Sequence, residues 1–341
     1  MREFPKGVHS ERVTRWAAAL VGQFCFWVVG FFPLAGVAAW EQIAPLPTPN
    51  GGFGCAILNG KIVVLGGTNW KNERKEWLDG IWVYEPQAGR WETKGKLPQS
   101  LAFPVVAEAG EELLIAGGSD GTKPRNEIWR LQPSFKLTAA GELSQPRAAA
   151  VGGFVSGKLA VAGGCADPAA LAGLCKGIEV HAWPKNDLIE SALPMATGLA
   201  IGAYVAVGNE LFVFGGSSRS ATGELINSNE TWKFNAVTGS WRQLAPYPVK
   251  ARGAAAVALG AEHVLIGGGF GGPKDYFLAT AYIYEVQQNT FHQSLDLPLA
   301  ALVGLVDCDG YVYCLGGEDR ERHRTDACFR IAVKELLATT R

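Results

Sequence analysis

The feature that most constrains this chain is a diglycine that closes a short run of strand-forming residues six times. The second glycines of these pairs lie 46 to 52 residues apart. Around each pair we expect the same order: a strand rich in small residues, a turn, the strand that ends in Gly-Gly, a variable loop, a third strand with aromatic residues and a fourth strand. The six copies are IVVLGG ending at Gly67, LLIAGG at Gly118, LAVAGG at Gly164, LFVFGG at Gly216, HVLIGG at Gly268 and YVYCLGG at Gly317.

A repeat of about 50 residues is typical of kelch-type propellers, in which each repeat forms a four-stranded blade around a central axis. The last copy lacks the Trp and Leu-Pro pattern of a fourth strand, and that pattern stands instead in WEQIAPLP at residues 40–47. An N-terminal strand that completes the last sheet would leave no long unpaired edge. We therefore expect residues 40–341 to form an all-β, six-bladed kelch-type β-propeller closed by an N-terminal strand.

Residues 1–39 form a separate segment, in which basic residues precede an uncharged stretch from Trp16 to Ala39. The stretch ends in small residues, so we expect a signal peptide cleaved near Ala39. It is also long enough for a membrane anchor, and both interpretations remain open. Either one places the propeller outside the cytoplasm, periplasmic or secreted or possibly membrane-anchored, with a membrane engaged only through an uncleaved leader.

Charge and cysteine content limit the partners. The 31 Lys and Arg residues nearly balance the 32 Asp and Glu residues, which gives no reason to expect nucleic acid. Outside the leader there are six cysteines, of which Cys165 and Cys175 could form a disulfide across one loop, while the others are equally explained as small buried hydrophobes. No CxxC pair or histidine cluster is present, so we expect neither a metal nor another cofactor.

The residue that follows each diglycine is a candidate for the functional site. Five copies continue with a small residue, whereas the sixth continues with Glu318 in the segment GGEDRERHRTD. Glu318 ends one expected strand and Arg324 begins the next, so their side chains can meet across the base of a hairpin. Such a pair could transfer a proton to a substrate whose acid group the arginine holds. It could equally be a surface ion pair on a charged loop.

The spacing of GGE, five residues and RTD resembles the active-site loop of the sialic acid mutarotases, kelch-type propellers also called N-acetylneuraminate epimerases. The long loop within residues 66–86 comes first in the chain and the GGE loop last, an order that resembles the cyclically permuted branch of that family. The resemblance implies an isomerase that interconverts the anomers of a sialic acid by ring opening, without a cofactor. It assigns acid and base chemistry to Glu318 and binding of the sugar carboxylate to Arg324, and it makes a small sugar acid the expected ligand.

Four further residues are expected to bind the substrate. Arg147 and Arg252 each precede an inner strand, where they could contact a ligand or cap the joint between blades, and Asn69 and Lys75 lie in the long first loop. The alternative function is a non-catalytic kelch propeller that binds a glycan or a protein, since a fold does not dictate a function. A copper radical oxidase is disfavoured because the five histidines are scattered along the chain.

Overall fold

The computed structural model describes residues 38–184, 187–274 and 276–340. The expected signal peptide or anchor therefore lies outside the described residues, apart from its last two positions. The described part is built almost entirely of β-strands, and its one helix is α1 (Val333–Ala338). That helix is too short to cross a bilayer, and no membrane-spanning helix occurs in the described ranges.

Six antiparallel sheets of four strands each make up most of the described chain. In five of them the four strands follow one another along the sequence. These sheets are β2 (Gly54–Leu58), β3 (Lys61–Leu65), β6 (Gly80–Glu85) and β7 (Arg90–Lys96); β8 (Val105–Ala109), β9 (Glu112–Ala116), β10 (Glu127–Leu131) and β11 (Leu137–Glu142); β12 (Val151–Val155), β13 (Lys158–Ala162), β16 (Gly177–Ala182) and β17 (Asp187–Ala192); β18 (Ala203–Val207), β19 (Glu210–Phe214), β22 (Thr231–Asn235) and β23 (Ser240–Gln243); and β25 (Ala255–Leu259), β26 (His263–Gly267), β29 (Ala281–Glu285) and β30 (Thr290–Gln293).

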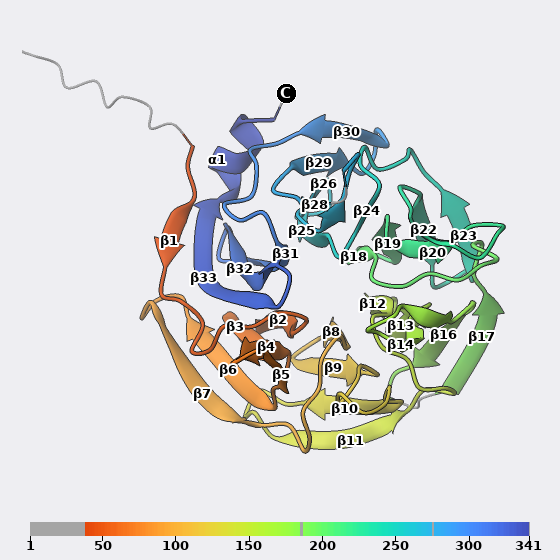
Figure 1. Cartoon of the computed structure of the whole chain (residues 1–341), viewed down its shortest axis with the longest axis horizontal. Coiled ribbons are helices and arrows are strands. Elements are labelled where there is room, and N and C mark those ends of the chain that lie inside the picture. Colours follow the sequence, from red (N-terminus) through yellow and green to blue (C-terminus); the bar gives the residue numbers. More distant parts are fainter. Residues whose placement is uncertain (1–37, 185–186, 275, 341) are drawn as a thin grey trace, which may run out of the picture. The chain divides into compact units, whose positions relative to one another are not determined.

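The sixth sheet combines strands from both ends of the described chain, β1 (Glu41–Ile43), β31 (Leu302–Cys308), β32 (Tyr311–Arg320) and β33 (His323–Ala332). Strand β1 pairs antiparallel with β33, and Glu41 lies opposite Arg330. The Arg330 Nε donates a hydrogen bond to Glu41 Oε2 at 2.8 Å. After β33 the chain forms α1 rather than another strand, so the segment at residues 40–47 supplies the outer strand of this sheet (Figure 1).

The first strands of the six sheets lie around a common centre (Figure 1). Each packs against the first strand of the next sheet, in the order β2, β8, β12, β18, β25, β31 and back to β2. Many of the residues that line the central channel are glycine or alanine, such as Gly152, Gly153 and Ala254, and the channel has a volume of about 600 Å³. Small residues are required there because the inner strands are crowded.

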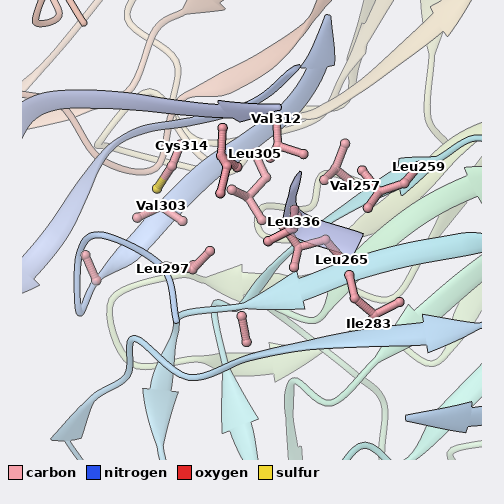
Figure 2. Close-up of a cluster of buried hydrophobic side chains, with 13 residues drawn as sticks. Val257, Leu259, Leu265, Ile283, Leu297, Val303, Leu305, Val312, Cys314 and Leu336 are labelled. Carbon is pink, nitrogen blue, oxygen red and sulfur yellow. The ribbon is translucent and has the colours of Figure 1, made fainter. Parts of the chain in front are cut away.

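Apolar layers between neighbouring sheets make the framework rigid. One such layer joins the β25 sheet to the β31 sheet and to α1, and its members include Leu265, Ile283, Val312 and Leu336 (Figure 2). All four side chains are almost fully removed from water. Burial on this scale is the main favourable contribution to folding, and it fixes the loops that project from the sheets.

Five diglycines directly follow the second strand and the sixth lies within β32, and in all six both residues have positive φ, as at Gly66 (60°) and Gly67 (101°). A Cβ at Gly66 would lie 1.9 Å from the carbonyl oxygen of Leu101, so only glycine fits. In the fifth copy three glycines occur in a row, and the conformation belongs to Gly268 (72°) and Gly269 (93°). The residue after this diglycine is therefore Phe270, whereas the pair that the sequence predicted to end at Gly268 made a small residue, Gly269, follow it.

Candidate functional site

The connections between second and third strands gather at one end of the sheets, and in four of the six copies they form small ribbons. We call the ribbons, together with the loops at residues 119–125 and 318–324, the ribbon face. The ribbons are β4 (Thr68–Lys71) with β5 (Arg74–Trp77), β14 (Cys165–Asp167) with β15 (Ala172–Leu174), β20 (Ser217–Arg219) with β21 (Leu225–Asn227), and β27 (Phe270–Gly271) with β28 (Tyr276–Phe277) and β24 (Ala251–Arg252).

Backbone hydrogen bonds link the copies at the centre of this face. In each of the first five copies, one residue with positive φ lies just before the inner strand. From the second copy to the fifth, the N–H group of this residue donates a hydrogen bond to the carbonyl oxygen of the corresponding residue in the preceding copy, at 2.6 to 3.0 Å. The sixth copy differs, because Leu302 pairs with Glu318 across β31 and β32. The rim formed by the other five copies thus stops at the sixth. Its members are Gly52, Phe103, Ala149, Ile201 and Gly253.

A small hollow of about 120 Å³ lies between this rim and the sixth copy, lined on the rim side by Gly52, Phe103, Ile201 and Gly253. Its walls are apolar, with Phe53, Phe103, Ile201 and Leu302 among them, and Glu318 is the charged residue of its lining. Sites that enclose small molecules usually measure about 300 to 1,000 Å³. The hollow therefore has room for one side chain rather than for a whole sugar acid.

Glu318 and Arg324 lie together in this region, at the ends of β32 and β33. Arg324 Nη1 lies 3.1 Å from Glu318 Oε1, and the Arg324 side chain is only 4% exposed against 29% for Glu318. The same guanidinium donates through Nη1 to the carbonyl of His323 at 2.9 Å and through Nε to Thr68 Oγ1 at 3.3 Å. Burial lowers the pKa of Arg324, although the carboxylate of Glu318 opposes that effect. Through its bond to Thr68, Arg324 connects the sixth copy to the first.

Lys75 of β5 lies near this pair, and its Nζ is 4.7 Å from the ring centroid of Trp77 and 5.6 Å from that of Phe103. The pKa of Lys75 is lowered, first by burial and then by the positive charge of Arg324, against the opposing effect of Glu318. Asn69 plays a local part, because its Oδ1 accepts a hydrogen bond from the N–H of Trp70 at 2.7 Å. The structure thus brings Lys75, but not the amide of Asn69, into the charged cluster.

Arg147 is buried in a joint between sheets, with 1% of its side chain exposed. It forms an ion pair with Glu179, and its Nη1 donates to the carbonyls of Gly163 at 3.2 Å and Gly177 at 3.4 Å. The sequence left capping and ligand contact open for this residue, and the structure places it in the capping position. Glu179 was missed because it lies 32 residues away from Arg147 in the sequence.

Arg252 connects two ribbons of the face. Its Nη1 donates to Asn227 Oδ1 at 3.1 Å, and its guanidinium lies 4.5 Å from the ring centroid of Phe270. The Nδ2 of Asn227 in turn donates to the carbonyl of Phe270 at 3.4 Å. Arg252 therefore holds β21 and β27 together.

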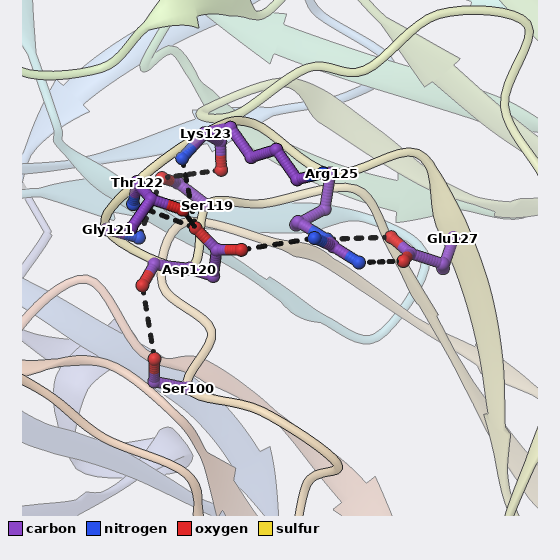
Figure 3. A network of polar contacts seen from close by, with 8 residues as sticks. All are labelled: Ser100, Ser119, Asp120, Gly121, Thr122, Lys123, Arg125 and Glu127. Atoms are coloured by element: carbon purple, nitrogen blue, oxygen red, sulfur yellow. Dashed lines mark hydrogen bonds and ion pairs between the residues drawn. The ribbon is translucent and has the colours of Figure 1, made fainter.

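The loop of the second copy contains a charged network that the sequence analysis did not single out (Figure 3). The carboxylate of Asp120 accepts hydrogen bonds from the N–H groups of Thr122 at 2.8 Å and Lys123 at 3.0 Å, and it pairs with Arg125 at 3.1 Å. Burial would raise the pKa of Asp120, but a hydrogen bond from the Thr122 hydroxyl at 2.6 Å, the two N–H bonds and the charge of Arg125 lower it to about 2. Arg125 also pairs with Glu127. The Ser-Asp-Gly-Thr turn at residues 119–122 was the available signal.

Three exposed hydrophobic side chains also belong to the ribbon face and were missed. Leu225 and Ile226 of β21 are 37% and 42% exposed, and Tyr276 of β28 is 50% exposed. We call these three residues the apolar patch. Their ribbons are the two that Asn227 and Arg252 connect. No period in the sequence distinguishes them, because loop residues follow no regular pattern.

All six cysteines of the described residues are free thiols, and Cys165 and Cys175 are both buried. The disulfide that the sequence allowed between them is not formed in this structure. Within the described ranges, no group of three or more His, Cys, Asp or Glu residues is arranged to hold a metal ion.

Comparison with known proteins identifies the repeat. The Kelch motif family matches residues 49–98 and 203–246. The chain is 24% identical over 300 residues to Kelch-like protein terF of Aspergillus terreus, covering 78% of this chain and 62% of that protein. It is 22% identical over 274 residues to Kelch-like protein 35 of Mus musculus, covering 79% and 43%. With Beta-scruin of Limulus polyphemus it shares 24% identity over 232 residues, covering 65% and 25%.

The chain is therefore a kelch-repeat protein, and its all-β structure fits a kelch β-propeller. It spans less than two thirds of the length of each of these curated relatives.

The comparisons correct the expectation of an isomerase. The relatives that match across most of the chain are kelch-like proteins and a scruin, not isomerases. The geometry gives a physical reason why the motif misled: Glu318 and Arg324 form a largely buried ion pair that connects two sheets, beside a hollow too small for a sugar acid.

Proposed function

We propose that this chain is a non-catalytic, six-bladed kelch β-propeller, closed by β1, that binds a protein partner on its ribbon face. The six four-stranded sheets and the pairing of β1 with β33 support the blade count and the closure. The similarity to kelch-like proteins supports a protein partner rather than a small sugar acid. The leader pattern of residues 1–39 adds the proposal that this partner is met outside the cytoplasm.

The observation that carries the proposal is the apolar patch. Leu225, Ile226 and Tyr276 expose their side chains on two ribbons that are fixed to each other by Asn227 and Arg252. Exposed apolar groups on a rigid support, with charged residues around them, are typical of protein interfaces. Tyrosine is also among the residues that contribute most to binding free energy in such interfaces.

The central channel does not suit the sugar acid that the sequence suggested. Its lining holds two charged residues, Glu108 and Asp307, and both are acidic. Burial raises the pKa of each carboxyl group, and the negative charge of Asp307 raises that of Glu108 further. A carboxylate ligand would be repelled there. The ribbon face therefore remains the better candidate surface.

Site-specific photo-crosslinking in the native host tests this proposal. A benzophenone amino acid is introduced at Ile226 or Tyr276, and a matched control carries it at Ile189, which is 56% exposed on the outer strand β17. We expect the same protein to be crosslinked from positions 226 and 276 and not from position 189. The variant I226D/Y276A should then weaken binding of the purified partner by at least about tenfold. The absence of adducts at both ribbon positions would refute the proposal.

A further inference from the structure

We propose that Lys75 and Arg324 form a subsite on the ribbon face for a single carboxylate of the protein partner, an aspartate or glutamate side chain. This inference rests on the proposed function, because it assumes that the occupant belongs to a protein. Beyond that function, the inference specifies which chemical group of the partner is bound, namely a carboxylate. The subsite lies in the first and sixth copies, whereas the apolar patch lies in the fourth and fifth.

The two cations have donors that the described contacts do not use. The ammonium group of Lys75 lies over the rings of Trp77 and Phe103, and within the described part of the chain it forms no ion pair. The described bonds of Arg324 use Nε and Nη1, which leaves the N–H groups of Nη2. Both side chains can therefore donate to an added acceptor.

The charge count identifies the guest as a monoanion. Arg324 pairs with Glu318, and the charge of that carboxylate also acts on Lys75, so the three groups together carry one excess positive charge. The negative charge of Asp319 also raises the pKa of Arg324, but it is the last of the causes, and the Asp319 carboxylate itself contacts Nδ1 of His323. A carboxylate would neutralise the cluster. A phosphate group, which carries about −1.5 to −2 at neutral pH, would place excess negative charge beside Glu318.

The pKa shifts of Lys75 and Arg324 also favour an added carboxylate. The pKa of Lys75 and that of Arg324 are both lowered, with burial as the largest cause, so their charged forms are incompletely compensated. Arg125 has two carboxylate partners, and hydrogen bonding to Glu127 is the largest cause of its raised pKa. An added carboxylate would give Arg324 and Lys75 the compensation that Arg125 already has, through charge-assisted hydrogen bonds.

The apolar surroundings fit the rest of an acidic side chain. The rings of Trp77 and Phe103 lie beside the ammonium group, and Phe103 also lines the adjoining hollow of about 120 Å³. A cavity of this size accepts the methylene groups of one side chain. Partial exclusion of water there would strengthen the ionic contacts.

Lysine-directed NMR tests the subsite. The full chain is reductively methylated with ¹³C, the Lys75 signal is assigned with Lys75→Arg, and the protein is titrated with N-acetylglutamate amide or with the neutral control N-acetylglutamine amide. We expect a saturable shift of the Lys75 signal with the acid and at least about fivefold weaker binding of the amide. Arg324→Gln should weaken binding of the acid at least about fivefold, and Arg324→Lys should restore part of it.

Three outcomes would overturn the subsite: no saturable shift, equal binding of acid and amide, or binding of inorganic phosphate as tight as that of the acid. Because Arg324 is buried, each Arg324 variant is first checked for an unchanged thermal transition. If that transition has shifted, the comparison of acid and amide binding to the unsubstituted protein decides whether the subsite exists. The variant I226D/Y276A should leave the titration unchanged. If no protein is crosslinked at the apolar patch but the Lys75 signal still shifts with the acid, the result contradicts the proposed partner surface and leaves the carboxylate subsite standing.

Discussion

The loops of the second and the sixth copies both place an arginine beside a carboxylate at the same end of their sheets, yet they differ in charge balance. Arg125 has two acidic partners, Asp120 and Glu127, whereas Arg324 shares one carboxylate with Lys75. The pKa of Arg125 is raised and that of Arg324 is lowered. The loop of the second copy is a structural brace whose arginine is fully paired, and the loop of the sixth copy retains capacity for another anion.

This difference shows that a short acid-and-arginine motif does not define a chemical role. The number of countercharges and the depth of burial decide whether the guanidinium only stabilises the loop or can also bind a guest. The following predictions test the comparison, beginning with the largest expected effect.

Replacing Arg125 with Met should destabilise the protein most, by about 2 to 3 kcal/mol, because two largely buried carboxylates lose their countercharge. Urea denaturation at pH 7 measures this effect. The matched control is Lys96→Met, which removes an exposed pair with Asp79 and should cost no more than about 0.5 kcal/mol. Equal losses in the two variants would show that the loop of the second copy is not a brace.

Replacing Glu318 with Gln should have a smaller effect, a loss of about 1 to 2 kcal/mol, because the carboxylate is partly exposed but compensates two cations. The pKa of Lys75 should fall further, since Glu318 is the group that raises it. Denaturation and NMR titration of Lys75 measure the two effects. Glu321→Gln serves as the control, because that side chain is 88% exposed.

Asp120 of the second copy and Lys75, which lies near the Arg324 pair, should also respond to opposite ends of the pH scale. The folded-state pKa of Asp120, about 2, lies below its ordinary value of 3.8, so its contribution to stability is present above pH 4 and is lost as the pH falls towards 2. The folded-state pKa of Lys75 lies below 10.5, so the stability that depends on Lys75 should rise with pH between that lowered value and 10.5. Denaturation curves at several pH values, with Asp120→Asn and Lys75→Met as references, separate the two contributions. If the stability of the Lys75→Met variant rises with pH in the alkaline range just as that of the unsubstituted protein does, the contribution assigned to Lys75 is wrong.

Lys75→Met should change stability least, by no more than about 0.5 kcal/mol in either direction. Removing the ammonium group relieves its desolvation and its repulsion from Arg324, while the aromatic contacts of the side chain are largely kept. Thermal denaturation measures the effect. A loss above about 1 kcal/mol would mean that Lys75 has a structural partner in the folded protein.

The sequence indicated the repeat and the class of fold because each diglycine imposes a local conformation that only glycine adopts at low cost, and because Trp40 and Leu46 mark a fourth strand. The approach of Glu318 to Arg324 could be anticipated, since a hairpin makes it a local event. The environment of Lys75 could not, because Phe103 comes from a different copy of the repeat. The three-glycine run of the fifth copy misled for a related reason: only the structure tells which two of its residues take positive φ.

The pairing of β1 with β33 also has a kinetic consequence. Glu41 and Arg330, which bond to each other, are 289 residues apart in the sequence, so this sheet depends on the longest-range contact described here. During synthesis β1 leaves the ribosome long before its partner exists, and the last sheet cannot be completed until nearly the whole chain has emerged. Contacts of such separation are entropically costly to form. We therefore expect variants that weaken β1, such as Glu41→Ala, to slow the final stage of folding more than the early ones.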